Sequence, residues 1–347
     1  MSSTRERPTR TSDGLRKFHR MPGSRKRWTG SSKTGPISNA NRSTTFINRD
    51  LTDMMTDTQN LPPSEHTLRT LLNALPEMHD LHSSRTLSYR FLNDLCQSVT
   101  KDMFSSVEPV AREFGPFGPL QFPYLEMGAV TSLDLFGIDE LIIFAFYWSN
   151  RGNYRRVADL GANIGLHSLC LARCGYEVKC FEPDPETFAK LNDNLARNGA
   201  STVDAIQAAI SVEDGTTEFI RVIGNRTGSH LAGAKSDAYG ALDKFTVTTQ
   251  AFRRVIEWAD LMKIDVEGHE AELIVATTSS DWAGVDAILE VGSPENARAI
   301  FQHLTRIGVN MFAQLGNWRR VENIAEMPTS YRDGSLFVTS KTQMPWQ

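Results

Sequence analysis

A short polar segment follows the first predicted buried strand of the sequence. It begins at Asp159 and continues into a turn formed by Gly161, Ala162, Asn163 and Gly165, after which a helical pattern starts at once. Glycines in such a turn remove side chains that would hold a ligand away from the backbone. Because open α/β sheets bind ligands outside the carboxyl ends of their strands, we expect this turn to contact a cofactor. The structural alternative is a glycine turn that binds nothing.

An acidic segment follows the second predicted strand. It reads Glu182, Pro183 and Asp184, and Glu182 lies 23 residues after Asp159. An acid about 20 residues beyond a glycine turn is placed to accept hydrogen bonds from the hydroxyls of a ribose. The glycine turn, the helix and this acid occur in the order that a nucleoside-binding site requires. A nucleoside cofactor is therefore favoured over a purely structural turn.

The residues of the turn separate two nucleoside cofactors. A dinucleotide site has glycine at three places in a G-x-G-x-x-G turn, but this chain has Asn163 at the second place and Leu166 at the third. Asp159 would also repel a pyrophosphate. S-adenosylmethionine carries no phosphate, and its α-ammonium is a group that Asp159 can neutralise. The residues therefore favour S-adenosylmethionine over NAD.

A third polar group follows the fourth predicted strand, where Asp265, Glu267, His269 and Glu270 crowd one turn. An imidazole with a pKa near 6.5 can accept a proton at neutral pH. We predict that His269 is a catalytic base, that Glu267 orients it or acts directly, and that Asp265 lies near the reactive end of the cofactor. Similar oxygen and nitrogen ligands hold divalent cations, so metal dependence stays open. The structural alternative is that Asp265 and His269 cap the next helix.

The other histidines and the cysteines carry less functional signal. His167, in the helix after the glycine turn, is expected to pack or to cap that helix. His230 falls in a predicted loop, where solvent exposure is expected and a substrate contact is the alternative. Four cysteines (Cys96, Cys170, Cys174 and Cys180) do not form a disulfide framework in a chain of 347 residues, so reduced thiols are expected. Packing is expected for the last three.

Strands and helices alternate from residue 155 onward, which predicts a parallel α/β sheet with helices on its faces. The segment 64–105 reads as amphipathic helices, and the segment 114–125 reads as an aromatic loop or short hairpin. We expect these two segments to form a lid or wall over an acceptor site, with packing against the flank of the sheet or a dimer contact as the alternatives. The predicted strands are 156–160, 178–182, 203–208, 261–265, 286–291, 309–314 and 335–339.

The net charge of −4 is distributed unevenly along the chain. Residues 1–50 hold 12 Lys and Arg against 3 Asp and Glu, whereas the remaining residues hold 25 against 38. The acidic body is a poor general binder of nucleic acid. We predict a disordered basic tail at 1–50, a helical cap at 51–112 and a catalytic domain at 113–347. Translation starting at Met54 or Met55 is a further interpretation of the tail.

No apolar run approaches the roughly 20 residues that a membrane-spanning helix needs. The longest, Leu141–Trp148, has eight residues. No apolar segment resembling a secretory signal begins the sequence. We therefore expect a cytoplasmic protein without a membrane span.

Taken together, the three polar segments resemble those of one known family. Asp159-x-Gly-Ala-Asn-x-Gly165, then Glu182-Pro-Asp184, then Lys263-Ile-Asp-Val-Glu-Gly-His-Glu270 are similar in order and spacing to the FkbM family of S-adenosylmethionine-dependent methyltransferases. The resemblance covers about residues 135–292, and the Lys-Ile-Asp-Val-Glu-Gly element is its most specific part.

The resemblance implies a class I methyltransferase fold, which is Rossmann-like, with a seven-stranded, mostly parallel sheet whose last strand is antiparallel. It implies O-methylation of a hydroxyl on a small molecule, a sugar or glycan, or a secondary metabolite. By the same resemblance, the glycine turn lines the methionine half of the cofactor, Glu182 takes the ribose and Asp265 lies near the sulfonium.

Two other functions remain open at this point. A nucleic-acid methyltransferase would depend on the basic tail, and the chain lacks both the Asn/Asp-Pro-Pro-aromatic element and a suitably placed nucleophilic cysteine. A protein that binds S-adenosylmethionine without catalysis is the third interpretation, and the acidic turn after the fourth strand argues against it. A homo-oligomer is compatible with the sequence.

Overall fold

A mixed eight-stranded sheet forms the centre of the computed structural model, which describes residues 61–128, 130–222, 230–231 and 242–346. These residues belong to one compact unit, Thr58–Gln347. The predicted tail at 1–50 and the start of the predicted cap lie outside the described residues. The strand order across the sheet is β13 (Arg319–Arg320), β12 (Asn310–Ala313), β14 (Leu336–Thr339), β11 (Asp286–Leu289), β10 (Leu261–Ile264), β3 (Arg156–Leu160), β4 (Glu177–Phe181) and β5 (Asp204–Ile206).

All seven predicted strands are present, and an eighth is added. The run from β11 to β5 is parallel, and β14 pairs antiparallel with both β11 and β12. The prediction of seven strands is wrong, because the sheet also contains the short edge strand β13. That strand consists of two exposed arginines paired with β12, so it carries no apolar pattern that could have indicated a strand.

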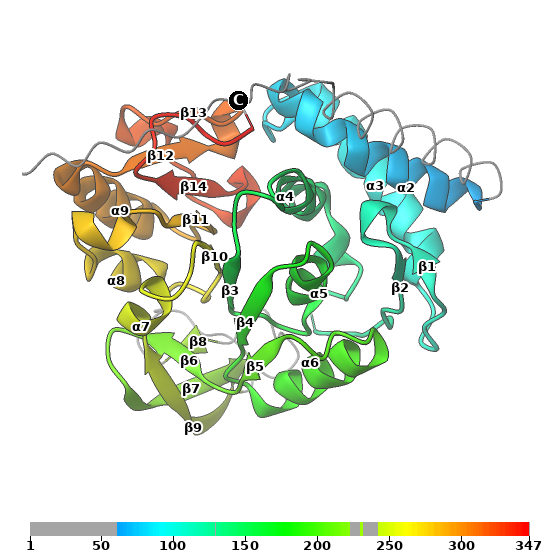
Figure 1. The fold of residues 1–347 in the computed structure, drawn as a ribbon, viewed down its shortest axis with the longest axis horizontal. Coiled ribbons are helices and arrows are strands. Elements are labelled where there is room, and N and C mark those ends of the chain that lie inside the picture. Colours follow the sequence, from blue (N-terminus) through cyan, green and yellow to red (C-terminus); the bar gives the residue numbers. More distant parts are fainter. Residues whose placement is uncertain (1–60, 129, 223–229, 232–241, 347) are drawn as a thin grey trace, which may run out of the picture. The chain divides into compact units, whose positions relative to one another are not determined.

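Helices cover both faces of this sheet (Figure 1). Alternate residues of each strand enter different cores, as the two-residue period of a strand requires. Val157, Leu261 and Ile288 join the core under α4 (Ile138–Ser149), α5 (Leu166–Arg173) and α6 (Pro185–Arg197). Ala158 and Met262 join the opposite core, under α7 (Phe252–Ile256), α8 (Glu270–Val275) and α9 (Pro294–Ile307).

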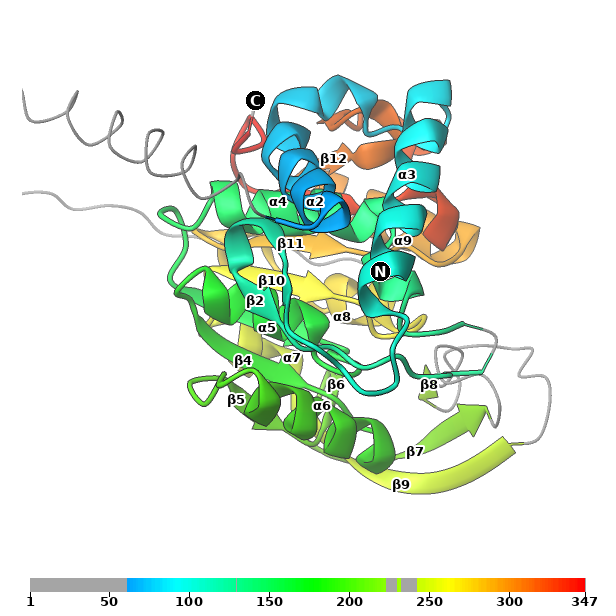
Figure 2. The same ribbon diagram turned by 90° about the vertical axis from the view of Figure 1, so that its right-hand side faces the viewer.

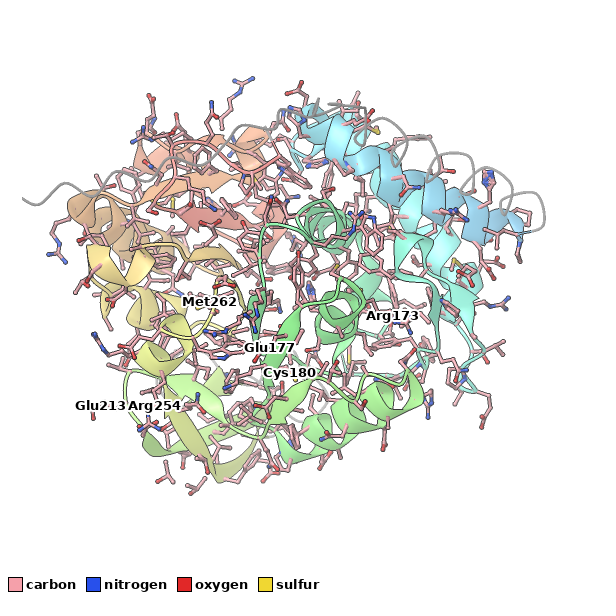
Figure 3. The ribbon with its side chains drawn as sticks, viewed as in Figure 1. Arg173, Glu177, Cys180, Glu213, Arg254 and Met262 are labelled. Carbon is pink, nitrogen blue, oxygen red and sulfur yellow. The ribbon has the colours of Figure 1, made fainter. Side chains whose placement is uncertain are left out.

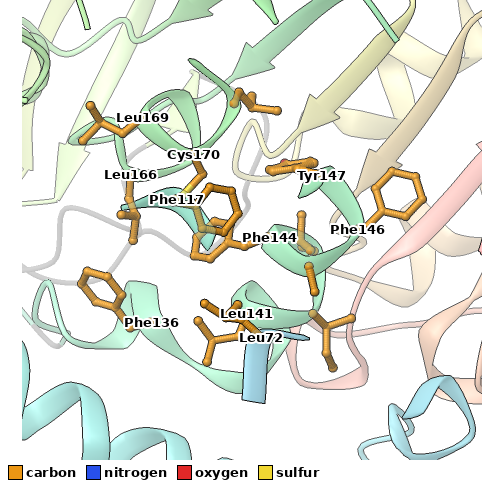
Figure 4. Close-up of a cluster of buried hydrophobic side chains, with 14 of the residues drawn as sticks. Leu72, Phe117, Phe136, Leu141, Phe144, Phe146, Tyr147, Leu166, Leu169 and Cys170 are labelled. Atoms are coloured by element: carbon orange, nitrogen blue, oxygen red, sulfur yellow. The ribbon is translucent and has the colours of Figure 1, made fainter. Parts of the chain in front are cut away.

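The N-terminal helices pack against α4. They are α2 (Pro63–Ala74), the 3-10 segment η2 (Leu75–Leu81) and α3 (Leu87–Phe104). Leu72 lies beside Leu141 in the shared core, and Figure 4 shows both among the aromatic side chains of α4. These contacts with α4 favour packing for this segment, and a lid over an acceptor site stays a prediction.

The aromatic segment forms a two-stranded hairpin of β1 (Arg112–Glu113) and β2 (Pro119–Leu120). Phe114 and Phe117 are buried and make ring contacts with Phe144, and Arg173 at the end of α5 donates a hydrogen bond to the Phe117 carbonyl (2.7 Å) (Figure 3). These ring contacts join the hairpin to α4 and favour the packing alternative, and a wall over an acceptor site stays a prediction.

A second, four-stranded sheet was not predicted. Its order is β6 (Ala209–Ser211), β9 (Leu242–Ala251), β7 (Gly215–Val222) and β8 (His230–Leu231). The long strands β7 and β9 pair antiparallel and lie near β5 and α6 (Figure 2). Many of their residues are polar, only some are exposed, and a small core forms around Phe219 and Val247. The weak apolar alternation explains why the sequence did not indicate them.

The four cysteines are free and buried, and Cys180 lies on β4 (Figure 3). Within the described ranges, no helix is both long and apolar enough to cross a membrane.

Candidate active site

A pocket opens at the carboxyl ends of β3, β4 and β10, and strands of the second sheet form its opposite wall. This is the place at which an open α/β sheet is expected to bind its ligand. The lining residues are Gly161, Asn163, Phe181, Glu182, Pro183, Asp184, Thr187, Ala208, Ala209, Ile210, Phe219, His230, Leu231, Asp265, Val266 and Glu267.

The glycine turn is held by contacts that only glycine permits. Gly161 has a φ of +79°, and a Cβ at this position would lie 1.8 Å from the backbone oxygen of Asp265. The N–H groups of Gly161 and Ala162 both donate to the Phe181 carbonyl (3.0 and 2.9 Å). Gly165 has a φ of +90° and precedes the first residue of α5. The turn therefore brings β3, β4 and β10 together and exposes backbone to the pocket.

Asp159 lies at the bottom of this turn with no exposed surface. Its Oδ2 accepts a hydrogen bond from the Ser168 hydroxyl (2.6 Å), whereas its Oδ1 has no hydrogen-bond partner in the described part of the chain. A buried carboxylate oxygen without a partner is costly unless a ligand satisfies it. Asp159 is not among the pocket-lining residues, and its role toward an ammonium group stays a prediction.

Glu182 presents a second buried carboxyl group to the pocket. Its two oxygens accept hydrogen bonds from the backbone N–H groups of Asn163 (3.0 Å) and Asp184 (2.9 Å). Burial nevertheless raises the pKa of Glu182 to about 8. Each carboxylate oxygen can accept a further hydrogen bond, so the group can receive ribose hydroxyls.

Asp184 lines the pocket, but its oxygens already have several donors. It caps α6 through the N–H groups of Glu186 and Thr187, and it forms a bidentate pair with Arg221 (2.6 and 2.9 Å). Burial alone would raise the pKa of Asp184, but the Arg221 hydrogen bond and the helix N–H groups outweigh it, and the pKa is lowered. This carboxylate therefore ties β7 to α6.

Asp265 and Glu267 line the pocket from the segment after β10. The ammonium of Lys263, which is 8% exposed, donates to Asp265 Oδ2 (3.0 Å). Burial alone would lower the pKa of Lys263, but the carboxylates of Asp265 and Asp159 raise it. Glu267 has a φ of +55°, a conformation that is uncommon for a residue with a side chain. Two of the three predicted catalytic residues, Asp265 and Glu267, therefore line the pocket.

His269, the predicted base, is not among the pocket-lining residues. Its Nδ1 lies 3.2 Å from Glu272, its Nε2 is buried without a hydrogen-bond partner in the described chain, and burial lowers its pKa. Neither Asp265 nor His269 caps α8 through its side chain. Glu270 instead accepts hydrogen bonds from the N–H groups of Val266 and Gly268 (both 3.0 Å) and fixes the turn.

The two other histidines differ in position. His167 packs as expected, with hydrogen-bond contacts to Glu140 (2.8 Å) and Tyr147 (3.1 Å). His230 was expected to be exposed, but it is 1% exposed, belongs to β8 and lines the pocket. The expectation of exposure is wrong because β8 pairs with β7 and closes the second sheet over the pocket.

Sequence reasoning missed three charged side chains near the pocket: Lys263, Glu140 and Glu290. Glu290 follows β11, and the pKa of its carboxyl group is raised by burial and by the neighbouring Asp265 and Glu267. The position of a lone acid directly after a buried strand was the available signal. No cluster of three or more His, Cys, Asp or Glu side chains suited to a metal ion occurs among the residues that the structure describes.

Comparisons with known proteins identify relatives of this chain. The sequence profile described as "Methyltransferase FkbM domain" matches residues 159–315. Methyltransferase sdnD of Sordaria araneosa is 30% identical over 179 residues, which cover 41% of this chain and 68% of that protein. Hexuronic acid methyltransferase AglP of Haloferax volcanii is 30% identical over 127 residues, covering 35% of this chain and 49%, about half, of that protein.

Solved structures show only a distant likeness. A SAM-dependent methyltransferase from Agrobacterium tumefaciens shares 10% identity, with 58% of this chain and 62% of that chain covered, at a TM-score of 0.32. A TM-score of this size does not by itself establish a shared topology. The sequence relatives and the pocket geometry therefore carry the assignment.

Proposed function

The chain belongs to the FkbM methyltransferase family, and we propose that it is an S-adenosylmethionine-dependent O-methyltransferase acting on a hydroxyl of a small molecule, a sugar or glycan, or a secondary metabolite. The observation that carries this proposal is the pocket that joins Gly161, Glu182 and Asp265 at the ends of three adjacent strands. One relative is named as a hexuronic acid methyltransferase, which supports a sugar-type acceptor.

The residues present fit the cofactor. Asp159 offers a buried oxygen without a hydrogen-bond partner to the α-ammonium, and Gly161 leaves the backbone open where a Cβ would collide. Glu182 has acceptor capacity left for the ribose. When bound, S-adenosylmethionine supplies a methyl group on a sulfonium, whose positive charge suits a site rich in carboxylates.

The residues of the chain must then hold the acceptor hydroxyl in line with the methyl group and the sulfur that leaves, and must remove the proton of that hydroxyl. Glu267 lines the pocket, so we assign it the role of base, with Asp265, held by Lys263, as the group that orients the hydroxyl. His269 stays a second candidate for the base. Its lowered pKa leaves the imidazole neutral at pH 7, and its Nε2 is available to accept a proton.

Calorimetry with S-adenosylmethionine and S-adenosylhomocysteine tests the cofactor assignment. We expect both to bind, and binding of neither would overturn the proposed function. Mass spectrometry of methyl transfer to sugars, phenols, polyketide-like alcohols and nucleic acids, with and without a chelator, then tests the acceptor and the metal dependence. Methylation of nucleic acid alone would favour the alternative enzyme class, and cofactor binding without any turnover would favour a binding protein.

The base is tested by the variants Glu267→Gln and His269→Ala. We expect the Gln variant to lose about 100-fold in kcat or more, in line with the usual contribution of a general base. Calorimetry should show that both variants still bind S-adenosylhomocysteine. A Glu267→Gln variant with full activity, beside an inactive His269→Ala variant, would transfer the role to His269.

A further inference from the structure

Glu290 stands directly beside Asp265 at the carboxyl end of the sheet. The parallel register pairs Lys263 with Ile288 and Ile264 with Leu289, and the N–H of Glu290 donates to the Ile264 carbonyl (3.1 Å). The next pair in this register is Asp265 and Glu290. Neighbouring strands lie about 4.8 Å apart, so the two residues are adjacent.

The two side chains also leave the sheet on the same face. Ile264 and Leu289 belong to the core under α8 and α9, whereas Leu261 and Ile288 belong to the core under α4 and α5. By alternation, Asp265 and Glu290 point toward the α4 and α5 side. Asp159 and Lys263, which are paired across β3 and β10, point the same way.

Several observations indicate that this face binds a ligand. Asp159 Oδ1 is fully buried and has no partner among the described residues. Asp265 has a side chain that is 27% exposed, and Glu140, which reaches the same face from α4, has one that is 28% exposed. Burial, followed by the carboxylates of Asp265 and Glu267, raises the pKa of Glu290 well above its ordinary value. A carboxyl group that holds a proton can donate a hydrogen bond as well as accept one.

The described charges around Asp265 are mostly negative. The carboxyl groups of Glu140, Asp265 and Glu267 lie close enough to Glu290 to raise its pKa, and the buried ammonium of Lys263 is bonded to Asp265. Carboxyl groups bind hydroxyls well because they accept and, when protonated, donate hydrogen bonds. The same groups repel a negatively charged acceptor at short range.

We propose that Glu290 contacts the methyl acceptor, and that Glu290 and Asp265 form a subsite for an uncharged polyhydroxyl compound. This inference rests on the proposed function, because it places the acceptor beside the cofactor pocket. The inference predicts a different acceptor from that of the relative whose name specifies a hexuronic acid. The carboxylate of a uronate would add a negative charge beside that of Asp265.

A matched pair of glycosides tests the inference by binding rather than by turnover. Calorimetry would compare p-nitrophenyl β-D-glucoside with p-nitrophenyl β-D-glucuronide, each added to the full-length protein saturated with S-adenosylhomocysteine. We expect the glucuronide, which differs by one carboxylate, to bind at least tenfold more weakly. Equal affinities, tighter binding of the glucuronide, or no binding of either probe would overturn the inference.

Variants at one position then test Glu290 itself. We expect Glu290→Ala to weaken glucoside binding about tenfold, the usual effect of losing one hydrogen bond to a polar ligand group, and Glu290→Gln to restore it to within threefold. Exposed Glu295 provides the control Glu295→Gln, which should match the unmodified protein. An unchanged Ala variant, or a Gln variant as weak as Ala, would overturn the role of Glu290.

The affinity for S-adenosylhomocysteine, measured first in each protein, separates the two proposals. Failure of the unmodified protein to bind it would overturn the proposed function and the inference together. Normal cofactor affinity with the wrong glycoside preference would overturn the inference alone.

Discussion

Buried carboxylates at the two ends of the central sheet have different hydrogen-bond environments. At the amino end, Asp286 is 1% exposed and accepts hydrogen bonds from Tyr154 (2.7 Å), Thr339 (2.5 Å) and Lys341 (2.5 Å). At the carboxyl end, Asp159 has no exposed surface, accepts one hydrogen bond from Ser168, and keeps one oxygen without a partner in the described chain.

This difference separates a stabilising end of the sheet from a binding end. Asp286 joins β11, β14 and the segment before β3. Asp159 instead keeps one oxygen without a hydrogen-bond partner in the described chain, and burial raises the pKa values of Glu182 and Glu290. Groups of this kind are typical of functional sites, where a ligand supplies the missing interactions and so stabilises the folded state.

The largest effect is expected at the amino end. Asp286→Ala leaves the Tyr154 hydroxyl and the Lys341 ammonium without their acceptor, and we expect the free energy of unfolding to fall by about 3 kcal/mol. Urea unfolding measures the loss, and calorimetry of the remaining folded protein should show unchanged affinity for S-adenosylhomocysteine. A loss of cofactor affinity without a loss of stability would contradict the division between the two ends.

The next largest effect is expected at Gly161. In Gly161→Ala the new Cβ meets the Asp265 carbonyl at a backbone φ of +79°, so the turn must move. We expect cofactor affinity to fall about 100-fold and stability to fall by about 2 kcal/mol. Gly175→Ala is the matched control, since Gly175 has a φ of +84° but nothing within 4 Å of its Cβ. Equal cofactor affinity in the two variants would show that the contact is unimportant.

Glu182→Gln should separate function from stability. Its raised folded pKa of about 8 means that the ligand-free protein loses stability as pH rises from the ordinary value of 4.5 to about 8, because the folded state holds a proton that the unfolded state releases. The Gln variant cannot ionise there. We expect its Tm to exceed that of the unmodified protein by a few degrees at pH 8 and to match it near pH 4, while cofactor affinity falls about tenfold. A Tm difference that does not depend on pH would contradict the raised pKa.

The smallest effect on stability and on cofactor affinity is expected for Arg254, which lies away from both ends of the central sheet. Arg254 pairs with Asp214 (2.6 Å), but the two side chains are 68% and 43% exposed, and Arg254 lies at the edge of the molecule in Figure 3. Arg254→Ala should change the free energy of unfolding by less than about 1 kcal/mol, as exposed ion pairs do. Thermal unfolding and cofactor calorimetry should both match the unmodified protein. A larger loss would mean that this pair supports α7 more than its exposure indicates.

The extent of the sequence prediction followed the strength of the apolar pattern. The strands of the central sheet carry buried apolar runs, and each predicted one is present. Strands β7 and β9 carry many polar residues and little apolar alternation, so their pattern resembled a loop. The resulting second sheet also explains His230, which entered the pocket wall because β8 pairs with β7.

The sequence predicted where the candidate site lies, but it identified only some of the residues that line it. The sequence located Gly161, Glu182, Asp265 and Glu267, because each follows a strongly predicted strand. It favoured His269 on spacing alone, but Glu270 binds the backbone of the turn and His269 lies outside the pocket lining. It overlooked Glu290, because only the strand order shows that β11 lies beside β10.

The sequence by itself determined the α/β class, the family and the residues that end each strand, since these depend on local periodicity and on motifs of contiguous residues. The tertiary structure alone decided which carboxyl groups meet. Asp159, Asp265 and Glu290 are far apart along the chain, and parallel pairing of β3, β10 and β11 brings them to one edge and one face. Burial and neighbouring charge, which depend on that pairing, then raise the pKa of Glu290.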